Sequence, residues 1–186
     1  MRTSAACLAG RSTPLLGAQM NIRSASLDDH GNLLHLYKRV ASIAGGLARL
    51  SDEIDDVYIK GFLENSIARG ICLVAETGTN ALQAEIHAYT PIPSCFAHVL
   101  SELTIAVDPD AQGKGLGRRI FETFMNIVET ERPKVSRVEL IARESNTKAI
   151  QFYETLGFVI EGRMKNRIAS VGGGYESDIA MAWLRA

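Results

Sequence analysis

The chain of 186 residues has an apolar fraction of 46% and a charged fraction of 22%, which is ordinary for one globular domain. Its formal net charge of −1 excludes a protein whose overall field recruits nucleic acid or an anionic membrane, although a local basic site stays open. Its apolar runs are far shorter than the roughly 20 residues that a membrane-spanning helix needs. We therefore expect no nucleic-acid partner and no membrane insertion.

The three cysteines, Cys7, Cys72 and Cys95, are odd in number and have no C-x-x-C spacing. This pattern argues against a disulfide framework and against a zinc site, so we expect no metal and a reducing, cytoplasmic location. Cys95 follows a turn-like segment at residues 91–94 and is open to interpretation as a nucleophile, but an inert apolar residue is the simpler interpretation.

Residues 1–19 are expected to lie outside the domain. They contain Arg2 and Arg11 but no acid, a composition that is also typical of targeting peptides. Because their apolar pieces are broken and Asn21–Arg23 begins a strand-like segment, we favour a disordered extension or a start placed too early, with Met20 as the natural start. Residues 20–186 are then expected to form a single domain.

Hydrophobic periodicity predicts three strands and two helices in the first half of the chain. The first helix is entered at Leu27–Asp29, with acids in its first turn, and the second ends before Gly70. The strands are expected at residues 21–26, 71–76 and 82–89, the second helix at 53–69, and a turn at 78–80.

The second half alternates strands and helices more regularly. This alternation indicates an α/β layered domain with some antiparallel pairing from hairpins. The strands are expected at residues 97–107, 135–142, 158–165 and 175–184, the helices at 117–131 and 146–156, and a turn at 172–174.

The most informative segment is the glycine-rich loop Gln112–Gly117, QGKGLG, which follows a strand and leads into a helix. The first amides of a helix lack intrahelical partners and lie at the positive end of the helix dipole, so they can bind an anion. Glycines allow the backbone to approach a phosphate closely, and Lys114, Arg118 and Arg119 add positive charge. The expected ligand is a pyrophosphate.

Two other phosphate-binding loops do not fit this segment. The Walker loop requires G-x-x-x-x-G-K-[ST], and the dinucleotide loop requires G-x-G-x-x-G, whereas these glycines are spaced two apart. By itself the loop is equally compatible with a glycine-rich turn that caps an ordinary helix.

Two motifs together resemble the GNAT N-acetyltransferase superfamily. The loop resembles its Q/R-x-x-G-x-G/A signature, and the later N-x-x-A-x-x-x-Y-x-x-x-G-F motif is matched by Asn146, Ala149, Tyr153, Gly157 and Phe158. The resemblance covers about residues 97–160 and implies an α/β fold with a mixed, mostly antiparallel central sheet, splayed strands and flanking helices. Residues 157–167 and 174–181 resemble the branch that contains polyamine and ribosomal-protein acetyltransferases.

The resemblance implies acetyl-CoA as cosubstrate, with its pantetheine arm between two diverging strands. Ile105 and Val107 would contact this arm through their backbone, and the Asn146 side chain would hydrogen-bond it, although Asn146 is also a good helix cap. The implied pyrophosphate contacts are Gln112, Gly113, Lys114, Gly115, Gly117 and Arg118, and the Lys114 side chain is expected to face solvent.

Tyr153 is the expected catalytic acid, because the thiolate that leaves during acetyl transfer needs a proton. Without the resemblance, a tyrosine packed beside Phe152 and Phe158 would be the better interpretation. For the base that deprotonates an ammonium substrate, Glu102 is the leading candidate and His98, four residues earlier on the same nominal strand face, is the alternative. A β-bulge between them would change which side chains face the cleft.

The acceptor is less visible in the sequence. A small-molecule or peptide amine is implied, and a homodimer is left open. The acidic residues Asp52, Glu53, Asp55 and Asp56 are suited either to attracting a cationic amine or simply to stabilising a helix N-terminus, and the second interpretation is favoured. The alternatives to an enzyme are a catalytically silent acyl-CoA-binding sensor or partner module and a ligand-free structural domain.

Overall fold

The computed structural model describes residues 20–43, 47, 49–77, 81–169 and 173–186. Its seven strands form one sheet in the order β1-β2-β3-β4-β5-β7-β6. The strands are β1 (Asn21–Ser24), β2 (Gly70–Glu76), β3 (Leu82–Tyr89), β4 (Val99–Val107), β5 (Arg137–Arg143), β6 (Val159–Ala169) and β7 (Tyr175–Leu184). The helices are α1 (His30–Ala41), α2 (Asp56–Arg69), α3 (Leu116–Glu131) and α4 (Thr147–Thr155).

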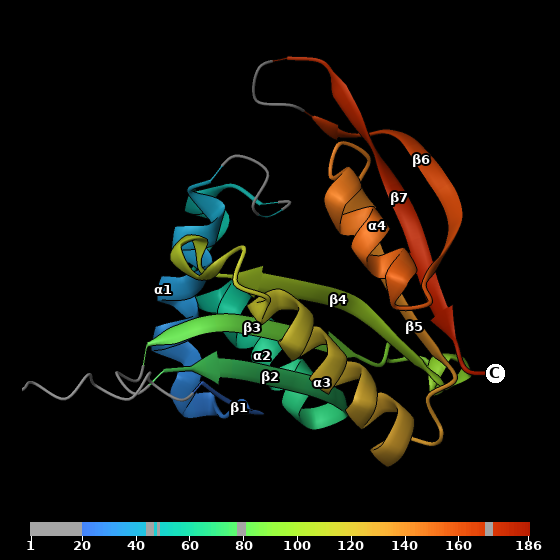
Figure 1. Ribbon diagram of the computed structural model, residues 1–186, viewed down its shortest axis with the longest axis horizontal. Helices are drawn as coiled ribbons and strands as arrows, with labels where there is room; N and C mark the ends of the chain where they lie inside the picture. The colour runs from blue at the N-terminus through green and yellow to red at the C-terminus, as the bar shows by residue number, and fades with distance from the viewer. Residues whose placement is uncertain (1–19, 44–46, 48, 78–80, 170–172) are drawn as a thin grey trace, which may run out of the picture.

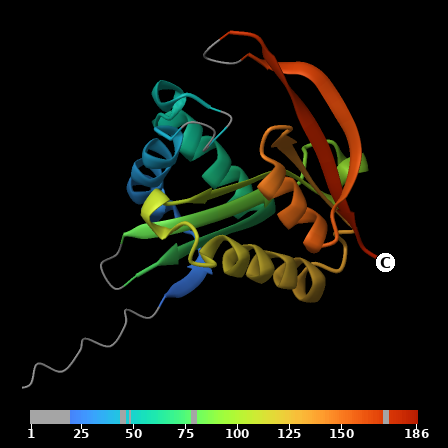
Figure 2. The same ribbon diagram turned by 45° about the horizontal axis from the view of Figure 1, so that its top comes forward.

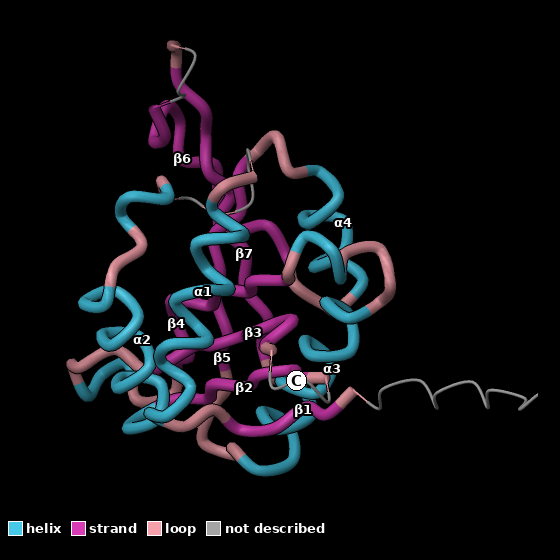
Figure 3. Tube along the Cα trace, turned by 90° about the vertical axis from the view of Figure 1, so that its left-hand side faces the viewer, coloured by secondary structure: helices cyan, strands magenta, loops and turns pink. Residues whose placement is uncertain are grey.

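Helices cover both faces of the sheet. Figure 3 shows α1 and α2 on one side of the strands and α3 and α4 on the other. Because side chains alternate along a strand, β2 sends Leu73 into the apolar cluster beneath α3 and Val74 into the cluster beneath α1 and α2. Strands β2 and β3 are therefore buried on both faces and hold the two layers together.

The sheet divides between β4 and β5. All other strand pairs are antiparallel, whereas β4 and β5 are parallel and pair only at Val99–Arg137 and Leu100–Val138. Beyond this short contact the two strands run apart, as Figures 1 and 2 show. The divergence leaves the polar backbone edges of β4 and β5 open over most of their length, which is unusual inside a sheet.

A β-bulge interrupts β4 where it borders the opening. Tyr89 pairs with Ser101 and His87 pairs with Thr104, so between these pairs one residue of β3, Ala88, opposes two residues of β4. Glu102 lies in this bulge with a φ of 57°, in the left-handed region that non-glycine residues seldom adopt. The bulge changes the alternation of side chains along β4.

Close approach of the backbone explains the glycine between α2 and β2. A Cβ at Gly70 would lie 2.1 Å from the carbonyl oxygen of Ala88 on β3. Gly70 therefore ends α2 and starts β2 with no room for a side chain, as its position after the helical pattern predicts.

The fold class is confirmed: the sheet is mixed, mostly antiparallel and splayed, with flanking helices. The helices and strands also lie where the periodicity predicts them, with one notable correction. The strand expected at 97–107 begins at Val99, because Ser94–Phe96 form a 3-10 turn and His98 lies in the turn that follows. Residues 1–19, the turn at 78–80 and Gly172 lie outside the described residues.

Candidate active site

The glycine-rich loop presents a run of backbone amides at the start of α3. Gly113 and Gly115 have φ values of 72° and 77°, and a Cβ built at either would have no atom within 4 Å. The first helical hydrogen bond of α3 runs from the amide of Arg119 to the carbonyl of Gly115 over 3.1 Å. Within the described part of the chain, the amides of residues 113 to 118 donate no hydrogen bond.

These amides are suited to an anion. They lie at the positive end of a 16-residue helix, and positive φ values let successive N–H groups converge on one ligand. The Arg118 guanidinium lies 5.1 Å from the Phe152 ring centroid and donates to Glu122 over 3.1 Å, so it stays half exposed beside the loop. Lys114 donates to the carbonyl of Asp110 over 2.8 Å, and Gln112 donates to the carbonyl of Val107 over 3.1 Å.

An arginine from the other layer holds the turn that precedes the loop. Arg39 of α1 donates to Asp108 over 3.0 Å and to Asp110 over 2.8 Å. Asp108 also accepts the amide of Asp110 over 2.9 Å and so caps the 3-10 turn Pro109–Ala111. The sequence analysis missed Arg39, because its partners lie about seventy residues further along the chain.

A cavity of about 920 Å³ occupies the opening between β4 and β5. It is lined from α2 through β3, β4, β5, α4 and the β6–β7 hairpin. Of the predicted site residues, the cavity brings together Glu102, Ile105, Asn146 and Tyr153. His98, Val107 and the loop at 112–118 do not line it, and the loop follows directly beyond the end of β4.

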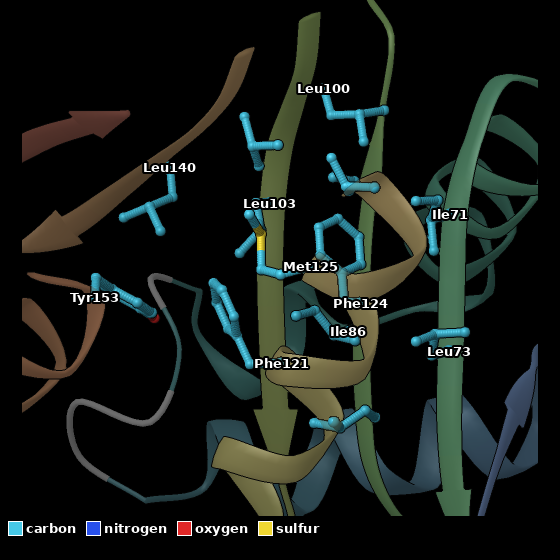
Figure 4. Packing of buried hydrophobic residues seen from close by; sticks show 14 of the residues in the cluster. Ile71, Leu73, Ile86, Leu100, Leu103, Phe121, Phe124, Met125, Leu140 and Tyr153 are labelled. Carbon is cyan, nitrogen blue, oxygen red and sulfur yellow. The ribbon is translucent and has the colours of Figure 1, made fainter. Parts of the chain in front are cut away.

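Tyr153 of α4 is one of the aromatic side chains that line the cavity. Its ring packs against Phe121, Phe152 and Phe158, with centroid distances of 5.6, 5.6 and 6.1 Å. Figure 4 shows its hydroxyl directed toward Phe121, with Leu140 of β5 above it in the view. Burial raises the pKa of Tyr153 to about 12, so the phenol keeps its proton at neutral pH. Its hydroxyl makes no hydrogen bond to a described residue.

Asn146 combines the two roles that the sequence leaves open. Its side-chain oxygen accepts the amide of Ala149 over 3.2 Å and caps α4. Asn146 also lines the cavity, and its amide nitrogen has no hydrogen-bond partner among the described residues. The cap fixes the side chain and leaves a donor for a ligand.

The two candidate bases have different surroundings. Glu102 is exposed and lines the cavity from the bulge in β4. His98 is exposed but lies before β4, and its carbonyl accepts the amides of Ser136 and Arg137 at the closed end of the opening. The argument that His98 and Glu102 share one strand face is therefore wrong, because His98 is outside the strand and Glu102 is in a bulge.

The acidic residues before α2 act mainly on local backbone. Asp55 caps α2 by accepting the amide of Tyr58 over 2.8 Å, and Glu53 accepts the amide of Leu50 over 2.8 Å. Glu53 also lines the cavity, and a carboxylate oxygen of Asp56 lies 3.6 Å from a ring nitrogen of His30. These contacts agree with the favoured interpretation as a helix N-terminus.

Polar residues on β3 were missed by the sequence analysis. Glu85 and His87 alternate with Ile86 and Ala88 and are buried beneath α1 and α2. The signal was present, because two ionisable residues at alternate positions interrupt an otherwise apolar strand. His87 lines the cavity, whereas Glu85 is enclosed.

The described part of the chain contains no group of three or more His, Cys, Asp or Glu residues placed to hold a metal ion. In the same residues, each helix is either too short or too polar to cross a membrane.

Comparison with known proteins gives one family match. The model of the acetyltransferase (GNAT) domain matches residues 68–160, which include the glycine-rich loop, Asn146 and Tyr153.

The proteins similar to this chain include two curated relatives and one solved structure. The [ribosomal protein bS18]-alanine N-acetyltransferase of Salmonella typhimurium is 41% identical over 87 residues, which are 45% of this chain and 57% of the relative. The spermidine N(1)-acetyltransferase of Escherichia coli is 33% identical over 129 residues, which are 69% and 64% of the two chains. The chain thus spans less than two thirds of either relative.

The solved structure covers more of the chain. The crystal structure of the ribosomal-protein-S18-alanine N-acetyltransferase from Escherichia coli has a TM-score of 0.69 and 27% sequence identity. The match covers 89% of this chain and 94% of that one, so the similarity extends over both arms of the sheet.

Proposed function

This chain belongs to the GNAT acetyltransferase family, and from that premise we propose that it transfers an acetyl group from acetyl-CoA to a primary amine. The observation that carries the proposal is the run of unpartnered amides at residues 113 to 118, directly beyond the end of a splayed strand. An extended cosubstrate can hold its pyrophosphate at these amides while its thioester reaches the cavity between β4 and β5.

The chain's own groups would bind the cosubstrate in two ways. The open backbone edge of β4 at Ile105 and Val107 offers peptide hydrogen bonds to the pantetheine arm, and Asn146 offers its side-chain amide. The amides of Gly113, Gly115 and Gly117, with Arg118 and Lys114 nearby, would bind the two phosphates, whereas the expected Gln112 amide instead donates to the carbonyl of Pro109 over 3.4 Å. With these contacts, the thioester of acetyl-CoA would lie beside Tyr153 and its phosphates would lie at the surface.

Acetyl transfer requires two protons to move. The ammonium form of the substrate must lose one proton before its nitrogen can attack the thioester carbon. After the C–N bond forms, the C–S bond breaks and the sulfur needs a proton, for which Tyr153 is the proposed donor. Because burial raises the pKa of Tyr153 to about 12, the phenol is fully protonated when the reaction begins.

Glu102 is the proposed carboxylate in proton removal from the amine. Its exposure connects it with solvent, and its position in the β4 bulge places it on the cavity wall. A negative charge there also favours entry of a cationic amine over an anionic substrate.

The acceptor is proposed only as a primary amine of a small molecule or a peptide. The names of the two relatives specify an alanine of a ribosomal protein and spermidine, and both present such an amine. The free thiols of Cys72 and Cys95 support a reducing, cytoplasmic setting as part of the same proposal.

The test combines cofactor binding with turnover. Thermal unfolding with and without acetyl-CoA should show stabilisation, because a ligand that binds only the native state raises the unfolding free energy. Thiol release should then be measured on a panel of polyamines, amino acids, aminoglycosides and peptides with free N-termini. Stabilisation with no thiol release on any amine would favour a catalytically silent acyl-CoA sensor. Absence of stabilisation at millimolar acetyl-CoA would contradict both the acetyltransferase and the sensor.

A further inference from the structure

Two ionisable side chains are buried next to each other on β3. Glu85 and His87 are two residues apart, so they point to the same face of the sheet, beneath α1 and α2. Their exposed fractions are 0% and 2%. Burial of ionisable groups is costly unless they are hydrogen-bonded, and such groups concentrate at functional sites.

The Glu85 carboxylate accepts two hydrogen bonds from groups that keep their protons. One carboxylate oxygen accepts from the Tyr37 hydroxyl over 2.6 Å, and the other accepts from the Cys72 thiol over 3.2 Å. Burial, reinforced by the negative charge of Glu85, raises the pKa of Tyr37 and of the Cys72 thiol. Both are therefore donors, and an ionised Glu85 satisfies them.

The third contact of Glu85 fixes the imidazole of His87. Nδ1 of His87 lies 2.9 Å from the oxygen that also accepts from Cys72. Facing an ionised carboxylate, Nδ1 carries a hydrogen, so the neutral ring has its lone pair on Nε2. The Phe62 ring stacks parallel to the imidazole at a centroid distance of 4.1 Å and holds the ring plane.

Nε2 is the ring nitrogen that remains available. It makes no hydrogen bond to a described residue, and it is not among the buried polar atoms that lack a partner. His87 and Phe62 line the same cavity as Tyr153 and Glu102. The cavity is thus lined by an imidazole whose orientation is fixed by a buried carboxylate.

On the basis of the proposed acetyl transfer, we propose that His87 is a catalytic proton acceptor for the amine substrate and that Glu85 is its positioning residue. The substrate ammonium gives one N–H proton to Nε2, and the nitrogen keeps the electron pair that attacks the thioester carbon. The imidazolium is stabilised by Glu85 and loses its proton to solvent by way of the exposed Glu102 on the adjacent strand. The nitrogen loses a second proton as the amide forms, and this proton replaces the one that Tyr153 gives to the leaving sulfur.

Other titratable groups surround the pair and contribute to its pH dependence. Each packed element supplies at least one, and three of these groups are tyrosines that are neutral near pH 7. They are Tyr37 from α1, Tyr58 from α2 with Arg49 over its ring, Cys72 from β2, Tyr89 from β3 with Arg69 beside it, and Glu102 from β4.

The decisive variant is His87→Asn, which keeps a donor toward Glu85 but removes Nε2. We expect kcat/KM for the best amine to fall about 100-fold at pH 7, within the range of general base catalysis. The loss should shrink as the pH approaches the pKa of the amine itself, since free amine then arrives from solution. Acetyl-CoA affinity should be unchanged. His35→Asn is the matched control, because His35 is exposed on α1 and outside the cavity.

Glu85→Gln tests the positioning role separately. Without the negative charge, the imidazolium is less stable, so the acidic limb of the kcat/KM profile should move to lower pH while turnover falls. A His87→Asn enzyme with wild-type kcat/KM and an unchanged pH profile would overturn the proposal.

A spectroscopic measurement covers the case in which the variants do not fold. Nitrogen-15 NMR of wild-type histidines near neutral pH should show a ring with protonated Nδ1 and unprotonated Nε2. The opposite tautomer would contradict the proposal even if the enzyme is active. This readout needs no turnover, so it separates failure of the His87 assignment from failure of the acetyltransferase assignment, which the amine panel and acetyl-CoA binding test.

Discussion

The two faces of the sheet are stabilised in different ways. Beneath α3, residues such as Ile86, Phe121 and Phe124 form a continuous apolar cluster, and the polar groups that matter are backbone amides at the helix start. Beneath α1 and α2, a hydrogen-bonded set of side chains around Glu85 is embedded in the apolar layer. The α3 face offers backbone amides to a ligand and carries Tyr153 in its apolar cluster, whereas the α1–α2 face carries hydrogen-bonded side chains around Glu85.

This difference separates two tasks. Pyrophosphate binding depends on loop geometry, so it should respond to changes that alter φ at the glycines. Proton transfer depends on a few side chains, so it should respond to removal of single atoms. Variants in the loop and variants of the proton-transfer side chains should therefore change different kinetic constants, and the predictions that follow are ordered by the size of the expected effect.

The largest effect is expected for Tyr153→Phe, which removes one hydroxyl from the cavity wall. We expect kcat to fall by about 10² to 10⁴, the usual contribution of an acid catalyst, while the Kd for acetyl-CoA stays nearly constant. Steady-state kinetics and calorimetric titration check the two quantities. Tyr175→Phe is the control, since Tyr175 is 72% exposed. Equal turnover in the variant would remove Tyr153 from the acid role.

Tyr37→Phe should mainly affect stability. It deletes the 2.6 Å hydrogen bond to a buried carboxylate, and a hydrogen bond to a charged group contributes about 1.5–3 kcal/mol. Because the folded-state pKa of Tyr37 is raised, its protonated form adds stability that is present below about pH 10, the unfolded value, and is lost at higher pH.

Urea unfolding of wild type and Tyr37→Phe checks this prediction. The stability difference should be largest near neutral pH and smaller above pH 10. A difference that grows with alkaline pH would mean that the folded state favours ionised Tyr37, contrary to the hydrogen bond with Glu85.

Gly115→Ala should weaken acetyl-CoA binding with little effect on the chemical step. A non-glycine residue at a φ of 77° costs about 1–2 kcal/mol, so the loop should relax and the Kd should rise about 10-fold. Gly31→Ala in α1 is the matched control, since a Cβ there meets no atom within 4 Å and the residue is helical. An unchanged Kd in Gly115→Ala would show that the loop does not hold the phosphates.

Glu102→Gln should have the smallest effect, because His87 is the proposed internal acceptor and Glu102 exchanges protons with solvent. We expect kcat/KM to fall less than 10-fold, below the usual range for loss of a general base, with a change in the shape of its pH profile. A loss as large as that of His87→Asn would instead make Glu102 the principal base.

The parts of the site that were predicted from the sequence are local. Gln112–Gly117 and the following helix are contiguous, so one short pattern specifies strand end, turn and helix start. The Asn146 cap and Tyr153 similarly lie on one helix seven residues apart. Such features are determined by residues that are close in the sequence, and the glycines directly indicate positive φ values.

The parts that the sequence analysis missed are assembled across the fold. The Tyr37–Glu85 contact joins residues 48 positions apart, and only the placement of α1 over β3 reveals it. The residue with a φ of 57° in the bulge is Glu102, not a glycine, so the local sequence does not indicate the unusual backbone. Assuming regular alternation along the strand therefore placed His98 wrongly relative to Glu102. Pairing between strands, rather than local pattern, decides which side chains reach the cavity.

The central claim is that backbone amides at residues 113 to 118 hold the pyrophosphate of acetyl-CoA. Amide NMR during titration tests it directly, with acetyl-CoA compared against acetyl-pantetheine, which lacks the phosphates. The account predicts large shifts of the Gly113, Gly115 and Gly117 amides with acetyl-CoA and small ones with acetyl-pantetheine. Saturating acetyl-CoA that leaves these three amides unperturbed would contradict it.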